Sequence, residues 1–378
     1  MKNKIWQIVN TLASVLQLVV GIWVGVSLAK MGILETKWMV LYAVTIAAVV
    51  MLNIVAVFRK SLWLKIFGLI FAVATITGCL FAYRYTNAFN NFLDRVAEPE
   101  EATEIVEVTK EPFAVYISGS DSRTGIETTA RSDVNIVVVV NPEREKILLV
   151  SIPRDTYVQL HDTTGLKDKL THAGVYGVEM SKATIEDFLR IQIDDTIKVS
   201  FDTVIRVVDQ LDGIDIESDQ AMSLKAENGK LCEYVVGKQH VDGDCALRFA
   251  RERKSYETGD RHRGENQQQV IASIIGKLSS SRDYVMKLPE ILDIAADSFE
   301  TSFSRNEISD FIRMQLVNGP KWSVESIAVD GTGTYEPTYS MGANRPLYVM
   351  IPSEASVDNV VKKIQQYLES DESENAED

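Results

Sequence analysis

The sequence predicts an α/β domain, with a mixed central sheet and helices on both of its faces, preceded by three transmembrane helices. Apolar stretches at about 5–28, 38–58 and 62–83 each have about 20 residues, the length of a helix that crosses a bilayer. Beyond residue 112, short runs rich in Val and Ile alternate with amphipathic stretches of helical length. The 378 residues therefore divide into transmembrane helices over 1–86, an acidic linker over 87–111, the α/β domain over 112–368 and a disordered acidic tail over 369–378.

Lys65 is the only charged residue within the three apolar stretches. Three buried core helices are the alternative, but uncharged apolar stretches of this length are rare in soluble cores. A cleavable signal peptide fits poorly, because three spans follow one another without a small-residue cleavage pattern. Lys2 and Lys4 precede the first span, and Arg59 and Lys60 lie between the second and third. The positive-inside rule then predicts a cytoplasmic N-terminus and an α/β domain outside the cell membrane.

The elements of the α/β domain can be placed in order. Strands are expected at 113–118, 134–140, 146–152, 196–201 and 213–218. The run VNIVVVV at 134–140 does not alternate, which is typical of a strand buried on both faces. NPEREK at 141–146 predicts a hairpin turn and therefore an antiparallel strand pair. Helices are expected in SKATIEDFLRI, with Ser181 and Thr184 as possible N-caps, in FDTVIRVVDQLDG, ending at Gly213, in GENQQQVIASIIGKLSS and in RNEISDFIRMQLV.

The net charge of −14 argues against a nucleic-acid partner, because binding to phosphates needs a basic face. Part of this charge lies in the acidic runs at 98–111 and 369–378, which are typical of solvated segments. Cys232 and Cys245 are the two cysteines of the α/β domain. In an oxidising exterior they could form a disulfide; otherwise they are small apolar residues of the core.

Four clusters of charged and amide residues stand near the ends of predicted strands or the starts of helices: Asp121, Arg123, Arg131 and Asp133; Arg154 and Asp155; Arg248, Arg251 and Arg253; and Asp260, Arg261, Arg263, Glu265 and Gln267. Arginine suits phosphate, since its planar guanidinium donates two parallel hydrogen bonds. Arg251 and Arg253 would share one face of an extended segment, and Arg263 and Gln267 one face of a helix start.

If these segments converge, they form a site for one multiply charged anion. Asp121 and Asp133 would repel that anion unless Mg²⁺ bridged them, and Mg²⁺ commonly binds one or two carboxylates together with ligand phosphates. The alternative is a set of surface salt bridges, each of which contributes little to stability. The residue pattern alone leaves both interpretations open.

Over about 110–350 the chain resembles the LytR-CpsA-Psr family. The resemblance lies in SGSDSR, RSDVNIVVVVNPEREKILLVSIPRDTYV, KDKLTHA, LDGIDI, VDGDCALRFARER and GDRHRGENQQ, which occur in this order. The late GTGTYEPTYSM and LYVM, with three preceding spans, are most similar to the CpsA-like capsule and exopolysaccharide branch. Some members of that branch carry an accessory domain after the last span, whereas only about 25 residues separate span and domain here.

The resemblance implies an extracytoplasmic transferase of cell wall biogenesis. Such a phosphotransferase moves a capsular, exopolysaccharide or teichoic-acid-like glycopolymer from an undecaprenyl-pyrophosphate carrier to peptidoglycan. It forms a phosphodiester, typically on the 6-hydroxyl of muramic acid. The family's sheet is covered by helices on both faces, and an apolar pocket holds the polyprenyl tail.

The resemblance also implies roles for individual residues. Asp121 and Asp133 match the family's Mg²⁺-associated aspartates. The residues that match its pyrophosphate ligands are Arg131, Arg154, Arg251, Arg253, Arg263 and Gln267. The candidate catalytic residues are Asp133, Arg131 and Arg154, with Asp133 the best candidate for a general base, although a loose transition state needs little help from a base. Asn266 stands where many relatives have Arg, and THAGVYGVEM departs from the family pattern after Lys169, which leaves the roles of Lys169 and His172 open.

Three other functions remain open. In a polyprenyl-pyrophosphate pyrophosphatase, water would replace the sugar acceptor, and the same Arg and Asp set would serve. A non-catalytic membrane regulator of polysaccharide synthesis is the second, although an acidic domain outside the membrane could not contact DNA. The third, a polysaccharide-binding module, would tolerate the loss of Asp121 and Asp133.

Overall fold

The computed structural model describes residues 2–59, 61–97, 108–120, 130–256, 259–280, 284, 291, 293, 294, 296 and 299–369. The chain divides into two compact units, Met1–Arg95 and Val96–Asp378. Asp121, Arg123, residues 98–107 of the acidic linker and the tail from 370 onward lie outside the described residues.

The first unit consists of three helices: α1 (Lys2–Met31), α2 (Thr36–Phe58) and α3 (Leu62–Val96). All three are long and apolar enough to cross a membrane, as the sequence predicts. α3 continues ten residues past the predicted boundary at 86, because no Gly or Pro interrupts the chain there. Buried polar side chains join the helices; the Asn53 amide donates to Gln17 Oε1 at 2.7 Å.

The second unit is built on a six-stranded sheet with the strand order β11-β6-β1-β2-β3-β12. These strands are β1 (Phe113–Ser120), β2 (Val134–Asn141), β3 (Lys146–Ser151), β6 (Asp195–Ser200), β11 (Phe299–Thr301) and β12 (Ser323–Ala328). β2 and β3 pair antiparallel across the predicted hairpin turn, with Asn141 opposite Lys146. β1 is parallel to β6 and β3 to β12, so the sheet is mixed, as predicted.

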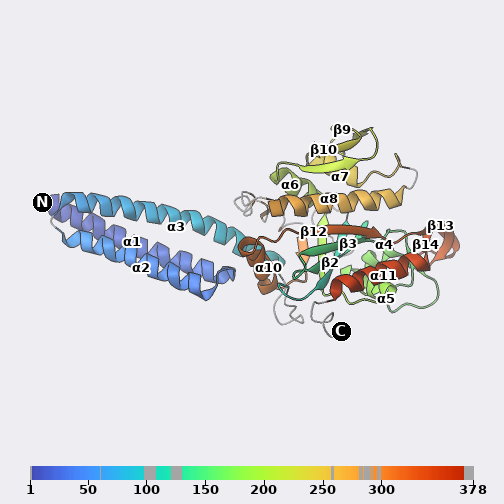
Figure 1. Ribbon diagram of the computed structural model, residues 1–378, viewed down its shortest axis with the longest axis horizontal. Helices are drawn as coiled ribbons and strands as arrows, with labels where there is room; N and C mark the ends of the chain where they lie inside the picture. The colour runs from blue at the N-terminus through green and yellow to red at the C-terminus, as the bar shows by residue number, and fades with distance from the viewer. Residues whose placement is uncertain are drawn as a thin grey trace. The chain divides into compact units, whose positions relative to one another are not determined.

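Helices cover both faces of this sheet (Figure 1). They are α4 (Leu170–Ala173), the 3₁₀ helix η2 (Gly174–Tyr176), α5 (Val178–Leu189), α6 (Phe201–Gln210), α7 (Gly243–Ala250), α8 (Asp260–Ser280), α10 (Arg305–Val317) and α11 (Glu354–Leu368). All eight residues of β2 are buried. Val137 and Val139 pack into the core beneath α5 and α11, whereas Ile136 and Val138 pack beneath α8 and α10. Burial on both faces explains the uninterrupted valine run.

Both possible N-caps predicted for α5 are wrong. α5 begins after Gly177, whose φ of 110° starts the helix, so Ser181 and Thr184 lie inside it and are fully buried. α6 ends at Gln210, and Gly213 follows with a φ of +79°, consistent with the predicted stop.

Four two-stranded sheets complete the unit. They pair β4 (Tyr157–Val158) with β5 (Asp168–Lys169), β7 (Ile214–Ser218) with β10 (Gly237–Val241), β8 (Met222–Lys225) with β9 (Leu231–Tyr234), and β13 (Gly331–Thr338) with β14 (Gly342–Pro352). A disulfide between Cys232 and Cys245 joins β9 to α7. Both sulfur atoms lie in a separate core formed by α6, α7, α8 and the small strands.

Candidate active site

The candidate site lies at one edge of the six-stranded sheet. β1, β3, β6 and β12 run parallel, so their carboxyl ends, at Ser120, Ser151, Ser200 and Ala328, all lie at this edge. β2 runs in the opposite direction and begins here, directly after Asp133. In open α/β sheets, ligands bind outside the carboxyl ends of the strands.

A small polar cleft at this edge brings together segments that are far apart in the sequence. Its lining residues come from the start of β2, the end of β3, the first turns of α8 and the end of β12: Asp133, Asn135, Ser151, Ile152, Pro153, Arg154, Arg261, Arg263, Gly264, Gln267 and Ala328. Arg263 and Gln267 are 8% and 9% exposed. The two residues expected to share a face at a helix start therefore do so, and that face lines the cleft.

Arg154 connects two carboxylates in the cleft. Its Nη1 donates to Asp133 Oδ1 at 2.7 Å, and its Nε lies 3.7 Å from Asp155 Oδ2. Asp155 Oδ1 in turn accepts a hydrogen bond from Lys169 Nζ at 2.8 Å. Asp133, Arg154, Asp155 and Lys169 thus form a row of alternating charge. Charge-assisted hydrogen bonds join Asp133 to Arg154 and Asp155 to Lys169, and a longer ion pair joins Arg154 to Asp155. In this geometry Arg154 orients the carboxylate of Asp133.

His172 lies in a second hydrogen-bonded group beside this row. Its Nδ1 is 2.7 Å from Asp168 Oδ1 and 2.9 Å from the Ser340 hydroxyl. Burial alone would raise the pKa of Asp168, but hydrogen bonds from His172, the Lys169 amide and Ser340 outweigh it, and the pKa lies below its usual value. His172 therefore ties the β13–β14 turn to the segment that carries Lys169.

Buried amides and a glycine fix α8 against the strand ends. A Cβ on Gly264 would lie 2.7 Å from Ser151 Oγ, so only glycine permits this approach of α8 to β3. Gln268 Nε2 donates to Leu149 O at 2.8 Å and to Ile327 O at 2.7 Å. Asn266 Nδ2 donates to Phe249 O at 3.1 Å. No role is predicted for Gln268 from the sequence. The run of amide side chains near the start of α8 was the feature that could have indicated such a contact.

The structure does not bring all predicted ligands into this cleft. Arg251 is the C-cap of α7, so the extended segment expected for Arg251 and Arg253 is wrong. Arg251 pairs with Glu227, and its guanidinium lies 5.0 Å from the Phe201 ring. Arg131 and Arg253 are exposed. The cleft therefore unites Asp133, Arg154, Arg263 and Gln267 and places Arg251 in a neighbouring cavity.

The side chains of the cleft can be tested as Mg²⁺ ligands. The described part of the chain holds no group of three or more His, Cys, Asp or Glu side chains able to bind a metal ion. Mg²⁺ does not need such a group where phosphates complete its coordination. Asp133 supplies one carboxylate, 26% exposed, and Asp121 lies outside the described residues. The described donors fit Mg²⁺ only together with a phosphate ligand.

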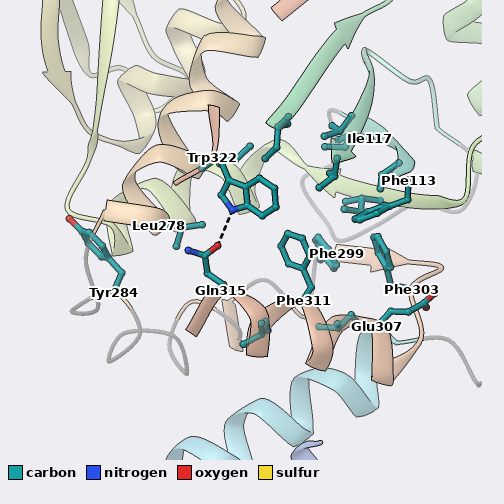
Figure 2. Close-up of a pocket in the computed structure, with 18 residues that line it drawn as sticks. Phe113, Ile117, Leu278, Tyr284, Phe299, Phe303, Glu307, Phe311, Gln315 and Trp322 are labelled. Carbon is teal, nitrogen blue, oxygen red and sulfur yellow. Dashed lines mark hydrogen bonds between the residues drawn. The ribbon is translucent and has the colours of Figure 1, made fainter. Parts of the chain in front are cut away.

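A larger, apolar cavity of about 430 Å³ lies under α8 and α10 (Figure 2). Apolar residues of β1, β2, β3 and β6 form its floor, and the rings of Phe113, Phe311 and Trp322 gather around it. Its two polar lining residues in α10 are engaged: Gln315 accepts a hydrogen bond from Trp322 Nε1 at 2.9 Å, and Glu307 belongs to a capping box. The cavity therefore presents an almost wholly hydrocarbon surface, suited to an apolar ligand.

Comparison with known proteins identifies the family. A model described as the LytR_cpsA_psr family matches residues 80–365. The chain belongs to the LytR-CpsA-Psr family. It is 29% identical to the polyisoprenyl-teichoic acid–peptidoglycan teichoic acid transferase TagV of Bacillus subtilis, in an alignment that covers 81% of this chain and 79% of that protein. It is 32% identical to the corresponding transferase TagU of Halalkalibacterium halodurans, in an alignment that covers 69% of this chain and 80% of that protein.

The fold comparison agrees with this assignment. The crystal structure of Bacillus subtilis TagV superposes with a TM-score of 0.56 and 30% identity, covering 68% of this chain and 98% of that one. In this LytR-CpsA-Psr domain, α8 lines both cavities. Arg263 and Gln267 in its first turns face the polar cleft, and Ile275 and Leu278 farther along face the apolar cavity.

Proposed function

We propose that this protein is a membrane-anchored phosphotransferase that moves a glycopolymer from a polyprenyl-pyrophosphate carrier to peptidoglycan. One observation carries the proposal: a single helix, α8, lines a cationic cleft at one end and a hydrocarbon cavity at the other. A polyprenyl pyrophosphate has the same two parts, an anionic head and an apolar tail. The printed names of the relatives, which are polyisoprenyl-teichoic acid–peptidoglycan transferases, support the same reaction.

In the proposed reaction a hydroxyl oxygen of the acceptor sugar attacks the phosphorus on the glycan side of the pyrophosphate. A new P–O bond forms, the P–O bond to the bridging oxygen breaks, and the lipid monophosphate leaves. Arg263 stabilises the charge on the phosphoryl oxygens, which is the main requirement of phosphoryl transfer. Asp133, oriented by Arg154, accepts the proton of the hydroxyl.

Mg²⁺, bound by Asp133, Asp121 and the phosphates, would supply further charge neutralisation at the bridging oxygen. Asp133 is one hydrogen-bonded carboxylate of the described cleft, and a single such group leaves room for phosphate oxygens in the Mg²⁺ shell. Cation dependence is therefore part of the proposal, together with the second aspartate.

We place the catalytic unit outside the cell membrane, with the N-terminus in the cytoplasm. Three membrane-capable helices separate the N-terminus from the catalytic unit. Because three is an odd number of crossings, the N-terminus and the catalytic unit would lie on opposite sides of the membrane. The basic residues near the first span favour this orientation over its reverse. The Cys232–Cys245 disulfide supports it, because disulfides persist in oxidising exteriors.

The polymer is proposed to be an anionic or capsular glycopolymer. The relatives' names favour a teichoic acid, whereas the late GTGTYEPTYSM motif resembles the capsule and exopolysaccharide branch. Both polymers would present the same pyrophosphate linkage to the cleft.

The test uses the full chain in lipid nanodiscs with a synthetic polyprenyl-pyrophosphoryl glycan, a peptidoglycan oligomer and Mg²⁺. We expect a glycan–peptidoglycan phosphodiester and lipid monophosphate in equal amounts. Arg263→Gln should lower the rate at least about tenfold, by loss of a charge-assisted contact in the cleft. Lys363→Gln, on the opposite face of the sheet, is the matched control.

Other outcomes identify the alternatives. Release of glycan phosphate without transfer would assign a pyrophosphatase. No turnover of the donor, with or without Mg²⁺, would contradict an enzyme and favour a regulator or a binding module. A further variant, Ile275→Trp, fills part of the apolar cavity and should raise the KM of the long-tailed donor while leaving a short-tailed donor unaffected.

A further inference from the structure

A second polar cavity lies beside the reaction edge, between the β8–β9 hairpin and α7. Its volume is about 250 Å³. The hairpin contributes Lys225, Ala226 and Glu227; α6 contributes Ile205; and α7 and its C-cap contribute Asp244, Leu247, Arg248 and Arg251. None of the residues that line the polar cleft lines this cavity, and the proposed reaction with the donor leaves it unused.

Contacts place the rim of this cavity next to the reacting groups. The Arg251 guanidinium lies 5.0 Å from the Phe201 ring, and a Cβ on Gly119 would lie 3.6 Å from the same ring. Gly119 O accepts a hydrogen bond from the Asp133 amide at 2.9 Å. Arg251 therefore stands at the same strand ends as Asp133. An acceptor held in the cavity would approach the donor phosphorus from the Arg251 side.

The charges around the cavity fit a sugar better than a second phosphate. Lys225, Arg248 and Arg251 offer donors, and Glu227 and Asp244 offer acceptors. A sugar hydroxyl both donates and accepts hydrogen bonds, so it can satisfy groups of either kind. A phosphate has no donor for the two carboxylates and would meet their repulsion. Ile205 and Leu247 add an apolar surface, as in most small-molecule sites.

The walls of the cavity are cross-linked, so that its shape is preformed. The Cys232–Cys245 disulfide joins the hairpin to α7. Asn228 Nδ2 donates to Asp244 Oδ2 at 2.7 Å, and Arg248 Nε donates to Lys225 O at 3.1 Å. Rigid walls reduce the conformational entropy that a ligand must overcome when it binds.

We propose that this cavity binds one sugar residue of the acceptor glycan and positions its hydroxyl for attack at the donor phosphorus. The proposal rests on the transferase function stated above and adds to it the place of the second substrate. It assigns Lys225, Glu227 and Asp244 to the acceptor, and Arg251 to the boundary between acceptor and donor.

The test compares two double variants of equal charge change. Lys225→Gln with Asp244→Asn alters the cavity, and the amide at 244 keeps an oxygen for Asn228. Glu233→Gln with Lys238→Gln alters two exposed residues of the same group of small strands and is the control. Steady-state transfer is measured with the acceptor and the donor varied separately. We expect the KM of the acceptor to rise about tenfold in the cavity variant only, with the KM of the donor within about twofold of wild type.

Binding of a peptidoglycan disaccharide in the absence of donor gives a second readout that does not depend on turnover. The cavity variant should bind about tenfold more weakly, while its thermal unfolding matches that of the control. An unchanged acceptor KM and affinity in a folded cavity variant would overturn the proposal, as would an equal loss in the control. A wild-type protein that binds the disaccharide but transfers nothing would instead contradict the transferase function and leave this site standing.

Discussion

Arg154→Gln removes the guanidinium that bonds Asp133 at 2.7 Å and lies 3.7 Å from Asp155. Of these two contacts only the first is within hydrogen-bonding range, and the loss of this charge-assisted hydrogen bond costs about 1.5–3 kcal/mol. Both side chains of this contact are about a quarter exposed, at 27% and 26%, which favours the lower half of that range. A loss of about 2 kcal/mol in transition-state stabilisation corresponds to about a 30-fold lower kcat/KM.

The assay is a double-mutant cycle of Arg154→Gln and Asp133→Asn, with kcat/KM for transfer as the readout. If Arg154 acts only by orienting Asp133, Arg154→Gln adds little when Asp133→Asn is already present, and the coupling free energy is about 2 kcal/mol. Lys363→Gln, which breaks a 2.8 Å ion pair with Glu325 on the other face of the sheet, should change the rate less than about twofold. Additive single effects, with coupling below about 0.5 kcal/mol, would refute the orienting role and assign Arg154 to the phosphate.

Three further outcomes follow from packing, burial and the disulfide. Gly264→Ala places a Cβ 2.7 Å from Ser151 Oγ and should lower activity about tenfold. Adding Ser151→Ala should restore activity, because the nearest atom of residue 151 is then its Cβ, 3.6 Å from the new methyl group; failure of this rescue would count against the steric cause. Burial raises the pKa of Asp195 from 3.8 to about 6, so the folded state holds the proton more tightly. The contribution of Asp195 to the free energy of unfolding should fall by about 3 kcal/mol at most between pH 4 and 6. Asp195→Asn should therefore make the pH profile less steep in urea titrations, and an unchanged profile would contradict the shift. Thiol titration of the unreduced, unfolded protein should find Cys232 and Cys245 blocked, and reduction should cost about 3 kcal/mol; two reactive thiols there would exclude the bond.

The fold could be predicted because its signals are local. The valine run of β2 and the turn after Asn141 lie within one short stretch, and both features appear in the structure. The start of α5 could not be predicted in this way. Ser181 and Thr184 have the residue types of N-caps, but the helix begins after Gly177, which has a positive φ. Cap signals by residue type occur at many positions, and packing decides among them.

The candidate site was predictable in part. Asp133 directly precedes β2, and Arg154 follows β3. Because these two strands form an antiparallel hairpin, the start of one lies beside the end of the other, and the proximity of the two residues follows from the strand pattern. The shared face expected for Arg251 and Arg253 needed an extended segment, whereas the helix α7 continues to Ala250 and Arg251 is its C-cap. The family resemblance implies an apolar pocket, but its walls could not be placed from the residues alone, since they come from five strands and two helices spread over the domain.

For the proposed polyprenyl-pyrophosphate donor, the position of α8 has a consequence for the length of the lipid. Arg263 at the polar cleft and Leu278 at the apolar cavity are fifteen residues apart on one continuous helix, a span of about 22 Å at the usual rise per residue. The length of α8 therefore sets the distance between the site for the pyrophosphate head of the donor and the far end of the site for its prenyl tail. A prenyl chain shorter than this span would leave the far part of the cavity empty, so affinity for the donor should increase in a step once the chain is long enough to cross it. Chain length would then be selected by the geometry of one helix, without any side chain that recognises the end of the lipid.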